Sequence, residues 1–361
     1  MRTSSEEVSR VAAATAPLVV RSLQVGDAAA VARWEAFVHQ CPQATFFHRA
    51  GWQRIVSEVF RHRTHFLYAE RAGQLEGVLP LAQVKSLLFG NALVSLPFAV
   101  YGGVAASTPQ AADLLEDEAQ AIARRLGVDH LELRNLRQRH PEWPQQDLYV
   151  RFRRAIAAEP EANMLAIPRK QRAMVRKGIK NGLRSEIDSD SRRFFALYAD
   201  NVHRHGTPAL SRRYFDQLLQ VFAGSCDIMT VVDETGRPLS SVLSFYFRDE
   251  VLPYYAGDEL SARELAANDF KYWELLRRSC ERGLKVFDYG RSKRDTGSYS
   301  FKKNWGFEPE PLFYEYCLYR RETVPQNNPA NAKYRLLINT WQRMPLGLAN
   351  WLGPFVVRSL G

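Results

Sequence analysis

The chain has 361 residues, a net charge of +10 and 46% hydrophobic residues, which excludes a disordered chain and is long enough for two globular domains. Its four cysteines are isolated from one another, which fits a reducing compartment better than a disulfide framework. The first residues lack the features of a signal peptide, and no stretch is long and apolar enough to cross a bilayer.

The first half alternates helices and strands after a flexible segment, 1–17. We expect a helix over 27–40 that begins at Asp27, a short helix over 51–60, a hairpin over 64–86 that turns at Ala72-Gly73, a strand over 92–96, a helix over 113–126 and a buried strand over 128–135.

A charged, proline-containing stretch near 139–161 separates the halves, and a basic segment follows it. Leu165 to Arg184 holds seven basic residues and no acidic residue. Pro168 predicts the first turn of a helix, and Gly182 predicts its end. Helical spacing places Val175, Ile179 and Leu183 on one face and Arg169, Arg172, Arg176 and Lys180 on another. This basic face is either an anchor for an anionic ligand or an ordinary solvated surface.

The second half repeats the order of the first. We expect a hairpin over 227–247 that turns at Thr235-Gly236, a strand over 250–257, a helix over 264–282 and a strand over 283–292. The segment AERAGQLEGVLPL parallels VDETGRPLSSVLSF, and AIARRLGVDHLELRN parallels SCERGLKVFDYGRS. Two similar αβ units in tandem explain the parallels, and chance similarity is the alternative.

Known catalytic signatures are missing from the sequence. It has no Walker loop, no dinucleotide fingerprint, no HExxH motif and no nucleophile elbow. His203 and His205 lie two residues apart without a cysteine or acidic partner at ligand spacing. We therefore predict no metal site.

The segments IPRKQRAMVRKGIKNGL, HGTPALSRRYFDQLL, ANDFKYWELLRRSCERGLKVFDYGRSK and GSYSFKKNWGFEPEPLFYEY carry a resemblance. Together they resemble the FemAB-type peptidyltransferases, and most closely the FemAB-related proteins associated with exosortase (PEP-CTERM) and exopolysaccharide systems. The resemblance implies an α/β fold of two tandem GNAT-like domains, each a central mixed sheet flanked by helices. We assign them to 18–155 and 160–320, the second being similar to BioF2-like acetyltransferases, with a basic amphipathic tail over 321–361.

The resemblance implies transfer of an acyl or aminoacyl group from an activated donor to an amine of a cell-wall- or exopolysaccharide-related acceptor. The donor stays open between acyl-CoA and aminoacyl-tRNA, and no covalently bound cofactor is expected. Lys302, in an aromatic-Phe-Lys context, is similar to a lysine of the Fem-type active site. A fixed cation there would stabilise the oxyanion formed by amine attack. Alternatively, Lys302 and Lys303 are solvated ends of an aromatic core helix.

The remaining candidate residues have general acid–base or binding chemistry. Asp269 on the long helix and Asp288 at a strand end are candidate general bases. We expect the substrate-binding residues to be Arg169, Lys170, Arg172, Arg176, Tyr255, Arg291, Lys293 and Lys303.

The expected partners are a phosphorylated or lipid-linked sugar acceptor and, with an aminoacyl donor, tRNA. The tail mixes apolar and basic residues, so it either lies on an anionic membrane surface or docks on the domain as a final helix. We expect a cytoplasmic protein, peripheral at the inner membrane if the tail binds lipid. The alternative functions are a non-enzymatic RNA- or anionic-polymer-binding protein and an inactive scaffold of an export system.

Overall fold

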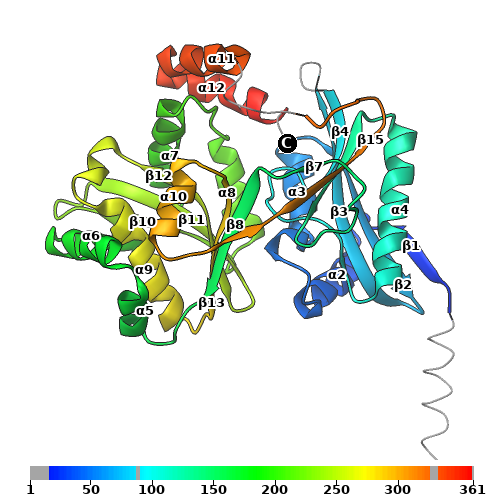
Figure 1. Ribbon diagram of the computed structural model, residues 1–361, viewed down its shortest axis with the longest axis horizontal. Helices are drawn as coiled ribbons and strands as arrows, with labels where there is room; N and C mark the ends of the chain where they lie inside the picture. Colours follow the sequence, from blue (N-terminus) through cyan, green and yellow to red (C-terminus); the bar gives the residue numbers. More distant parts are fainter. Residues whose placement is uncertain (1–15, 87–89, 326–331, 360–361) are drawn as a thin grey trace, which may run out of the picture. The chain divides into compact units, whose positions relative to one another are not determined.

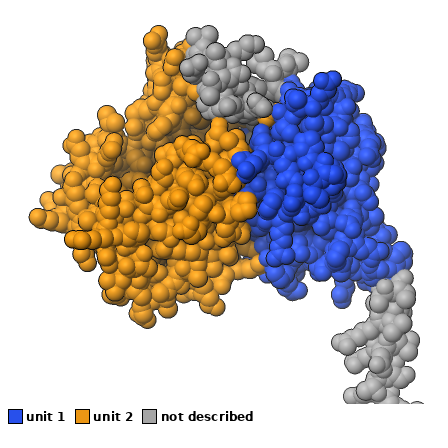
Figure 2. All heavy atoms as spheres, viewed as in Figure 1, with its two compact units in different colours: residues 1–147, 312–324, 361 blue, residues 148–311, 325–360 orange. Residues whose placement is uncertain are grey.

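The computed structural model describes residues 16–86, 90–325 and 332–359. It divides into two compact units, shown separately coloured in Figure 2: unit 1 contains residues 1–147 and 312–324, and unit 2 contains residues 148–311 and 325–360. The expected flexible segment, 1–17, lies outside the described residues except for its last two.

Unit 1 contains a mixed sheet (Figure 1). Its strands follow the order β1 (Leu18–Ser22), β2 (Arg63–Arg71), β3 (Gln74–Ser86), β4 (Gly90–Ser95), β6 (His130–Asn135), β15 (Phe313–Leu318) and β7 (Gln145–Gln146), and β5 (Ala105–Ala106) pairs with β3. The predicted hairpin is confirmed, because β2 and β3 pair antiparallel on either side of Ala72-Gly73. Strands β4 and β6 are parallel.

The helices of unit 1 are α2 (Ala28–Gln40), α3 (Gly51–Glu58) and α4 (Pro109–Leu126), with a 3₁₀ turn, η1, at Phe46–His48. The predicted start of α2 is confirmed, since the Asp27 carboxylate accepts a hydrogen bond from the amide of Ala30 at 2.9 Å. Helix α4 ends at Gly127, whose φ of +59° is the left-handed conformation that glycine adopts readily. Leu115 and Ala119 of α4 pack into a buried cluster with strands β2 to β6.

Unit 2 contains a second mixed sheet, in the order β9 (Arg184–Ile187), β10 (Cys226–Val232), β11 (Pro238–Phe247), β12 (Glu250–Asp258), β13 (Val286–Lys293), β8 (Tyr149–Ala155) and β14 (Pro309–Pro311). Its helices are α5 (Pro160–Ala166), α6 (Arg169–Lys180), α7 (Arg192–Arg204), α8 (Arg212–Val221), α9 (Ala267–Glu281) and α10 (Gly297–Asn304), with a 3₁₀ turn, η2, at Leu260–Arg263.

The two sheets share one strand order, which supports the predicted internal repeat. In each, a hairpin (β2–β3 or β10–β11) is followed by two parallel strands (β4 and β6, or β12 and β13) joined through a long helix, α4 or α9. The fold is therefore an α/β fold with two mixed sheets flanked by helices, as expected.

In each sheet a further strand pairs with the second parallel strand, β6 or β13. These two further strands do not belong to the units in which the expected division of the chain places them. In unit 1 the further strand is β15, which follows all of unit 2's strands, and in unit 2 it is β8, which precedes them. The expected ranges, 18–155 and 160–320, place each of these strands with the other unit. Strand pairing is decided by hydrogen bonds between residues far apart in the chain, which the local sequence pattern does not show. The bounds of the two GNAT-like domains, 18–155 and 160–320, remain a prediction.

The tail forms two helices, α11 (Ala332–Arg343) and α12 (Leu346–Val357), and both contact α7 of unit 2 (Figure 1). The His203 ring donates from Nε2 to the carbonyl of Met344 at 2.9 Å, between the two helices. The docked tail, one of the two expected alternatives, is thus observed. Among the described residues, no helix is long and apolar enough to cross a membrane.

The inserted strand β15 carries a buried carboxylate. Glu315 is fully buried and accepts hydrogen bonds from the Asn135 side chain at 2.6 Å and from the amides of Arg139 and His140 at 2.9 and 2.8 Å. These bonds tie the late strand β15 to β6 and to the loop after it.

We expect Glu315→Ala to destabilise unit 1 by at least ~2 kcal/mol, because one buried donor and two part-buried donors lose their acceptor. Exposed Glu322, for which no contact is found among the described residues, provides the control, and Glu322→Ala should change stability by less than ~0.5 kcal/mol. Hydrogen exchange of the β6 amides, combined with urea unfolding, measures the effect. Equal protection of β6 in the two variants would contradict the role given to Glu315.

Candidate active site

The parallel strands β12 and β13 separate after a short paired stretch. They pair at Glu250 with Val286 and at Val251 with Phe287, and among the described residues no further pair joins them, although β12 continues to 258 and β13 to 293. The register between β12 and β11 also skips Tyr254, which marks a bulge. Beyond Val251, β12 has no β13 partner among the described residues, and such a strand edge can bind an extended ligand as an added strand. We call this opening within unit 2 the β12–β13 wedge.

Lys302 of α10 bonds to the wall of this wedge. Its ammonium donates to the carbonyls of Tyr289, Arg291 and Gly290 at 2.8, 3.1 and 3.5 Å. These carbonyls lie where the register between β13 and β8 shifts, between Asp288 and Arg291. The lysine thus replaces strand partners that β13 lacks at this bulge.

The aromatic surroundings explain why this lysine is buried. Only 7% of Lys302 is exposed, and its nitrogen lies 5.7 Å from the centre of the Phe152 ring and 5.9 Å from that of Tyr289. Burial lowers the pKa of Lys302 to about 7, while the nearby Asp288 charge acts to raise it. In this structure the ammonium binds backbone carbonyls, and it is not the solvated helix end that was the alternative in the sequence. Contact with a reacting oxyanion remains a prediction.

The neighbouring Lys303 has a different environment. It is exposed, and its nitrogen lies 5.9 Å from the centre of the Tyr299 ring. Adjacent residues of a helix point about 100° apart, which is why one lysine is buried and the other solvated. A substrate-binding role for Lys303 remains a prediction.

Asp288 lies inside the bulge rather than at its surface. It is 1% exposed, and its carboxylate accepts from the Gly290 amide at 2.7 Å. Gly290 has a φ of +65°, and only glycine adopts this conformation without strain. This contact makes Asp288 a part of the turn in β13, so reaching an amine substrate would require the bulge to open. The role of Asp288 as general base remains a prediction.

Sequence reasoning did not identify Glu250, a further acid close to Asp288. Burial, and then the charge of Asp288, raise its pKa to about 7, although Arg153 binds it at 2.7 Å and lowers it. No sequence pattern predicts this pair. Arg153 lies on β8, which precedes the basic helix in the chain, and it lies 97 residues before Glu250.

Asp269 is a half-buried carboxylate of this region. It lies in the first turn of α9 and accepts from the Trp305 indole nitrogen at 3.0 Å. Burial raises its pKa, and the nearby Asp258 at the end of β12 acts in the same direction. Trp305 is fully buried and contacts the Tyr272 and Tyr289 rings. A carboxylate with a raised pKa beside an aromatic wall has the properties of a general base.

The other predicted binding residues are not gathered at one point. Tyr255 shares a hydrogen bond between hydroxyls with Tyr214 at 3.0 Å and packs on Phe215, and burial raises its pKa well above the usual range. Arg291 lies over the Tyr149 ring at 4.3 Å, and Lys293 is half-buried at the end of β13. Only Lys302, Asp288 and Arg291 meet at the β13 bulge.

The basic helix α6 has the predicted polar face. Arg169, Lys170 and Arg176 are exposed, Arg172 is half-buried and donates to the Leu165 carbonyl at 3.3 Å, and no ion pair involves these four residues within the described part of the chain. The predicted apolar face is partly wrong. Val175 is buried, but Ile179 is 50% exposed.

Gly178 contacts α9 in place of Ile179. A side chain at this position would meet Phe270 of α9 at 2.7 Å. The close approach of the two helices therefore turns the helix so that Gly178 is buried and Ile179 faces outward.

Arg154 of β8 is a cation that sequence reasoning missed. Its guanidinium lies 4.2 Å from the centre of the Phe307 ring and donates to the Gly306 carbonyl at 3.2 Å. One of its terminal nitrogens is buried without a hydrogen-bond partner among the described residues, and burial lowers its pKa. A side chain at Gly306 would contact both Arg154 and Pro168, so Arg154 lies beside the start of α6.

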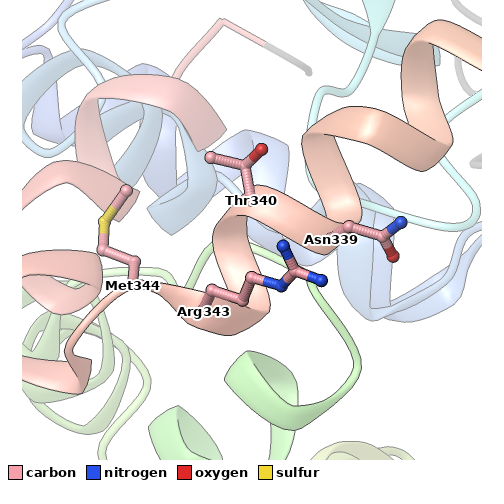
Figure 3. Close-up of a pocket in the computed structure, with 4 residues that line it drawn as sticks. All are labelled: Asn339, Thr340, Arg343 and Met344. Carbon is pink, nitrogen blue, oxygen red and sulfur yellow. The ribbon is translucent and has the colours of Figure 1, made fainter.

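The structure also contains a shallow pocket of about 440 Å³ at the end of α11 (Figure 3). Asn339, Thr340, Arg343 and Met344 line it, and none of them was predicted as a site residue. The residues that the structure describes form no group of three or more side chains suited to hold a metal ion.

Residues 169–303 match the family model described as Acetyltransferase (GNAT) domain. The match begins with α6, includes the whole β12–β13 wedge and ends within α10. Unit 2 therefore contains a GNAT-like acetyltransferase domain. No curated protein matches the chain by sequence.

Solved structures extend the likeness over both units. FemX has a TM-score of 0.63 and 14% identity, over 82% of this chain and 97% of its own. The C-terminal domain of an Agrobacterium fabrum protein provisionally assigned as a lysylphosphatidylglycerol synthetase has a TM-score of 0.55 and 14% identity, over 87% and 96%. A tandem GNAT protein from the clavulanic acid biosynthesis pathway has a TM-score of 0.54 and 13% identity, over 85% and 100%. At these identities the likeness shows the tandem GNAT-like fold.

We expect Lys302→Met to lower the free energy of unfolding by at least ~2 kcal/mol, because the carbonyls of the β13 bulge lose their donors while the side-chain volume is kept. Lys303→Met removes the same charge from an exposed site and should cost less than ~0.5 kcal/mol. Thermal and urea unfolding of both variants provide the comparison. Similar small losses would show that the three carbonyl contacts contribute little.

Proposed function

We propose that the protein is an N-acyltransferase whose unit 2 moves an acyl or aminoacyl group onto an amine. The separation of β12 and β13 within the region that matches the GNAT model carries this proposal. An extended donor binds along the exposed strand edges, and the acceptor nitrogen attacks its carbonyl carbon. A C–N bond forms, the thioester C–S or ester C–O bond breaks, the amine proton passes to a base, and the leaving sulfur or oxygen takes up a proton.

Asp269 is the best placed base for this reaction. It is half-buried rather than fully buried, and its raised pKa strengthens it as a proton acceptor. Lys302 acts either directly, as the cation for the developing oxyanion, or as a positioning residue that holds the β13 bulge. The contacts of Lys302 with three carbonyls support the second role.

The phosphates of the substrates bind at α6 in this proposal. The turn before α9, where a GNAT fold commonly binds pyrophosphate, contains Glu259 and Glu264, and Asp269 follows in the first turn. Carboxylates there oppose anion binding. The unpaired cations of α6 and the neighbouring Arg154 favour it. This anion is the phosphate of a nucleotide- or lipid-linked sugar acceptor, or of the donor, acyl-CoA or aminoacyl-tRNA.

We further propose that the acceptor belongs to the cell wall or to exopolysaccharide export, as the FemAB-type resemblance implies, and that transfer takes place on the cytoplasmic side of the inner membrane. Mass spectrometry of reactions that combine acyl-CoA or aminoacyl-tRNA with a panel of amino sugars tests the activity. Strongly salt-dependent RNA binding without turnover of any donor would favour the alternative of an RNA-binding protein.

We expect Asp269→Asn to lower turnover about 10²- to 10⁴-fold, and the fold to survive because the amide oxygen still accepts from Trp305. A carboxylate base must be deprotonated, so the activity of the wild type should rise with pH through the raised pKa of Asp269, and this rise should vanish in the variant. Glu308→Gln, at an exposed position, is the control. An unchanged pH profile in Asp269→Asn would assign the base elsewhere.

We expect replacement of Arg172 and Arg176 by Ala to weaken binding of the phosphorylated substrate and to reduce its salt dependence. Each lost charge-assisted contact is worth about 1.5–3 kcal/mol. Replacement of Arg63 and Arg213, two exposed cations outside α6, by Ala removes the same charge and should have a much smaller effect. Titration of each variant with the substrate at several salt concentrations measures this. Equal losses of affinity in both double variants would show that the basic face of α6 is an ordinary solvated surface.

A further inference from the structure

Helix α12 directs its small residues toward the protein. Ala349 is 1% exposed and Gly353 is buried. A side chain at Gly353 would lie 2.7 Å from the carbonyl oxygen of Ala209, which follows α7. Small residues at these positions let the helix approach the protein surface closely, but they bury little apolar area.

The large apolar residues of α12 face outward instead. Leu348, Trp351 and Phe355 are 45%, 65% and 65% exposed, and their spacing of three and four residues places them on one side of the helix. The Trp351 and Phe355 rings lie side by side, with 6.0 Å between their centres. A surface helix of a soluble protein normally has the opposite arrangement, so this stripe is expected to be covered in the working state.

The charge around the stripe favours a negatively charged cover. Residues 323–361 contain four basic residues, Lys333, Arg335, Arg343 and Arg358, and no acidic residue. Arg343 is exposed and lines the pocket that immediately precedes α12 in the chain (Figure 3). A pocket with guanidinium, amide and hydroxyl donors suits a phosphate headgroup.

The length of α12 fits a helix that lies flat. Its 12 residues span about 18 Å at 1.5 Å per residue, too little to cross a bilayer. Trp351 lies within the stripe, and tryptophan is the side chain most enriched at the boundary between headgroups and acyl chains.

We propose that α12 binds the surface of an anionic phospholipid membrane. Leu348, Trp351 and Phe355 enter the boundary between headgroups and acyl chains, and Arg343 meets the headgroup phosphates. Apolar insertion and charge act together, as stable peripheral binding requires. This inference concerns the tail alone and goes beyond the proposed transfer reaction, because an inactive scaffold could bind lipid in the same way.

Co-sedimentation of the full chain with vesicles provides the test. The chain should bind vesicles of phosphatidylglycerol mixed with phosphatidylcholine, and binding to phosphatidylcholine alone should be at least about tenfold weaker. Binding should shift Trp351 fluorescence to shorter wavelength. Replacement of Trp351 and Phe355 by Ser should reduce binding at least about tenfold, and Arg343→Ser should reduce it about fivefold. Leu260→Ser, at a 74% exposed position outside the tail, should bind like the wild type.

The substituted side chains face outward, so an unchanged melting temperature should accompany each variant. Three results would overturn the proposal: no binding of the wild type to the anionic vesicles, equal binding to phosphatidylcholine alone, or full binding by the double Ser variant. A fourth result that would overturn the proposal comes from light scattering. If the wild type is a dimer, the double Ser variant is a monomer and neither binds vesicles, a second copy of the chain covers the stripe.

Discussion

A strand that leaves its neighbour exposes backbone groups, and in unit 2 a lysine ammonium satisfies them. The carbonyls of Tyr289, Gly290 and Arg291 lie beyond the paired stretch of β12 and β13 and within a register shift toward β8. Buried carbonyls without donors would cost more than the open arrangement gains. Lys302 supplies the three donors. These hydrogen bonds of Lys302 therefore stabilise the separated arrangement of β12 and β13.

The same burial shifts the properties of the acids around the wedge. The Asp288 carboxylate accepts a hydrogen bond within the Gly290 turn, and Glu250 forms an ion pair with Arg153. Asp269 is half-buried and accepts a hydrogen bond from the Trp305 indole. Low dielectric surroundings raise the pKa of Glu250 and Asp269, but Glu250 is paired with Arg153 whereas Asp269 accepts from an indole. The ion pair with Arg153 stabilises the charged form of Glu250, so Asp269 is the acid proposed to take up the proton.

Two cationic regions stand apart from this acidic centre within unit 2. The face of α6 continues at Arg154, and the tail carries Arg343 beside an outward apolar stripe. Each lacks the mixed signs that ordinary protein surfaces use for ion pairing. One region suits the phosphate of a substrate and the other that of a membrane, and a lipid-linked acceptor would present both chemistries to one protein.

Local sequence alone determined part of the secondary structure, namely the two hairpins, the long helices α4 and α9 and the strands that follow them. The Asp27 cap, the Ala72-Gly73 turn and the Gly127 helix end depend on a few neighbouring residues, and they were predicted correctly. The family resemblance added the tandem GNAT-like architecture. Only the tertiary structure decided that β8 joins the sheet of unit 2 and β15 the sheet of unit 1. It also decided that Gly178 rather than Ile179 faces α9, and that Lys302 binds backbone carbonyls. Periodicity states which side of its own element a residue occupies. It cannot state what lies opposite, because that partner is brought there by pairing between residues far apart in the chain.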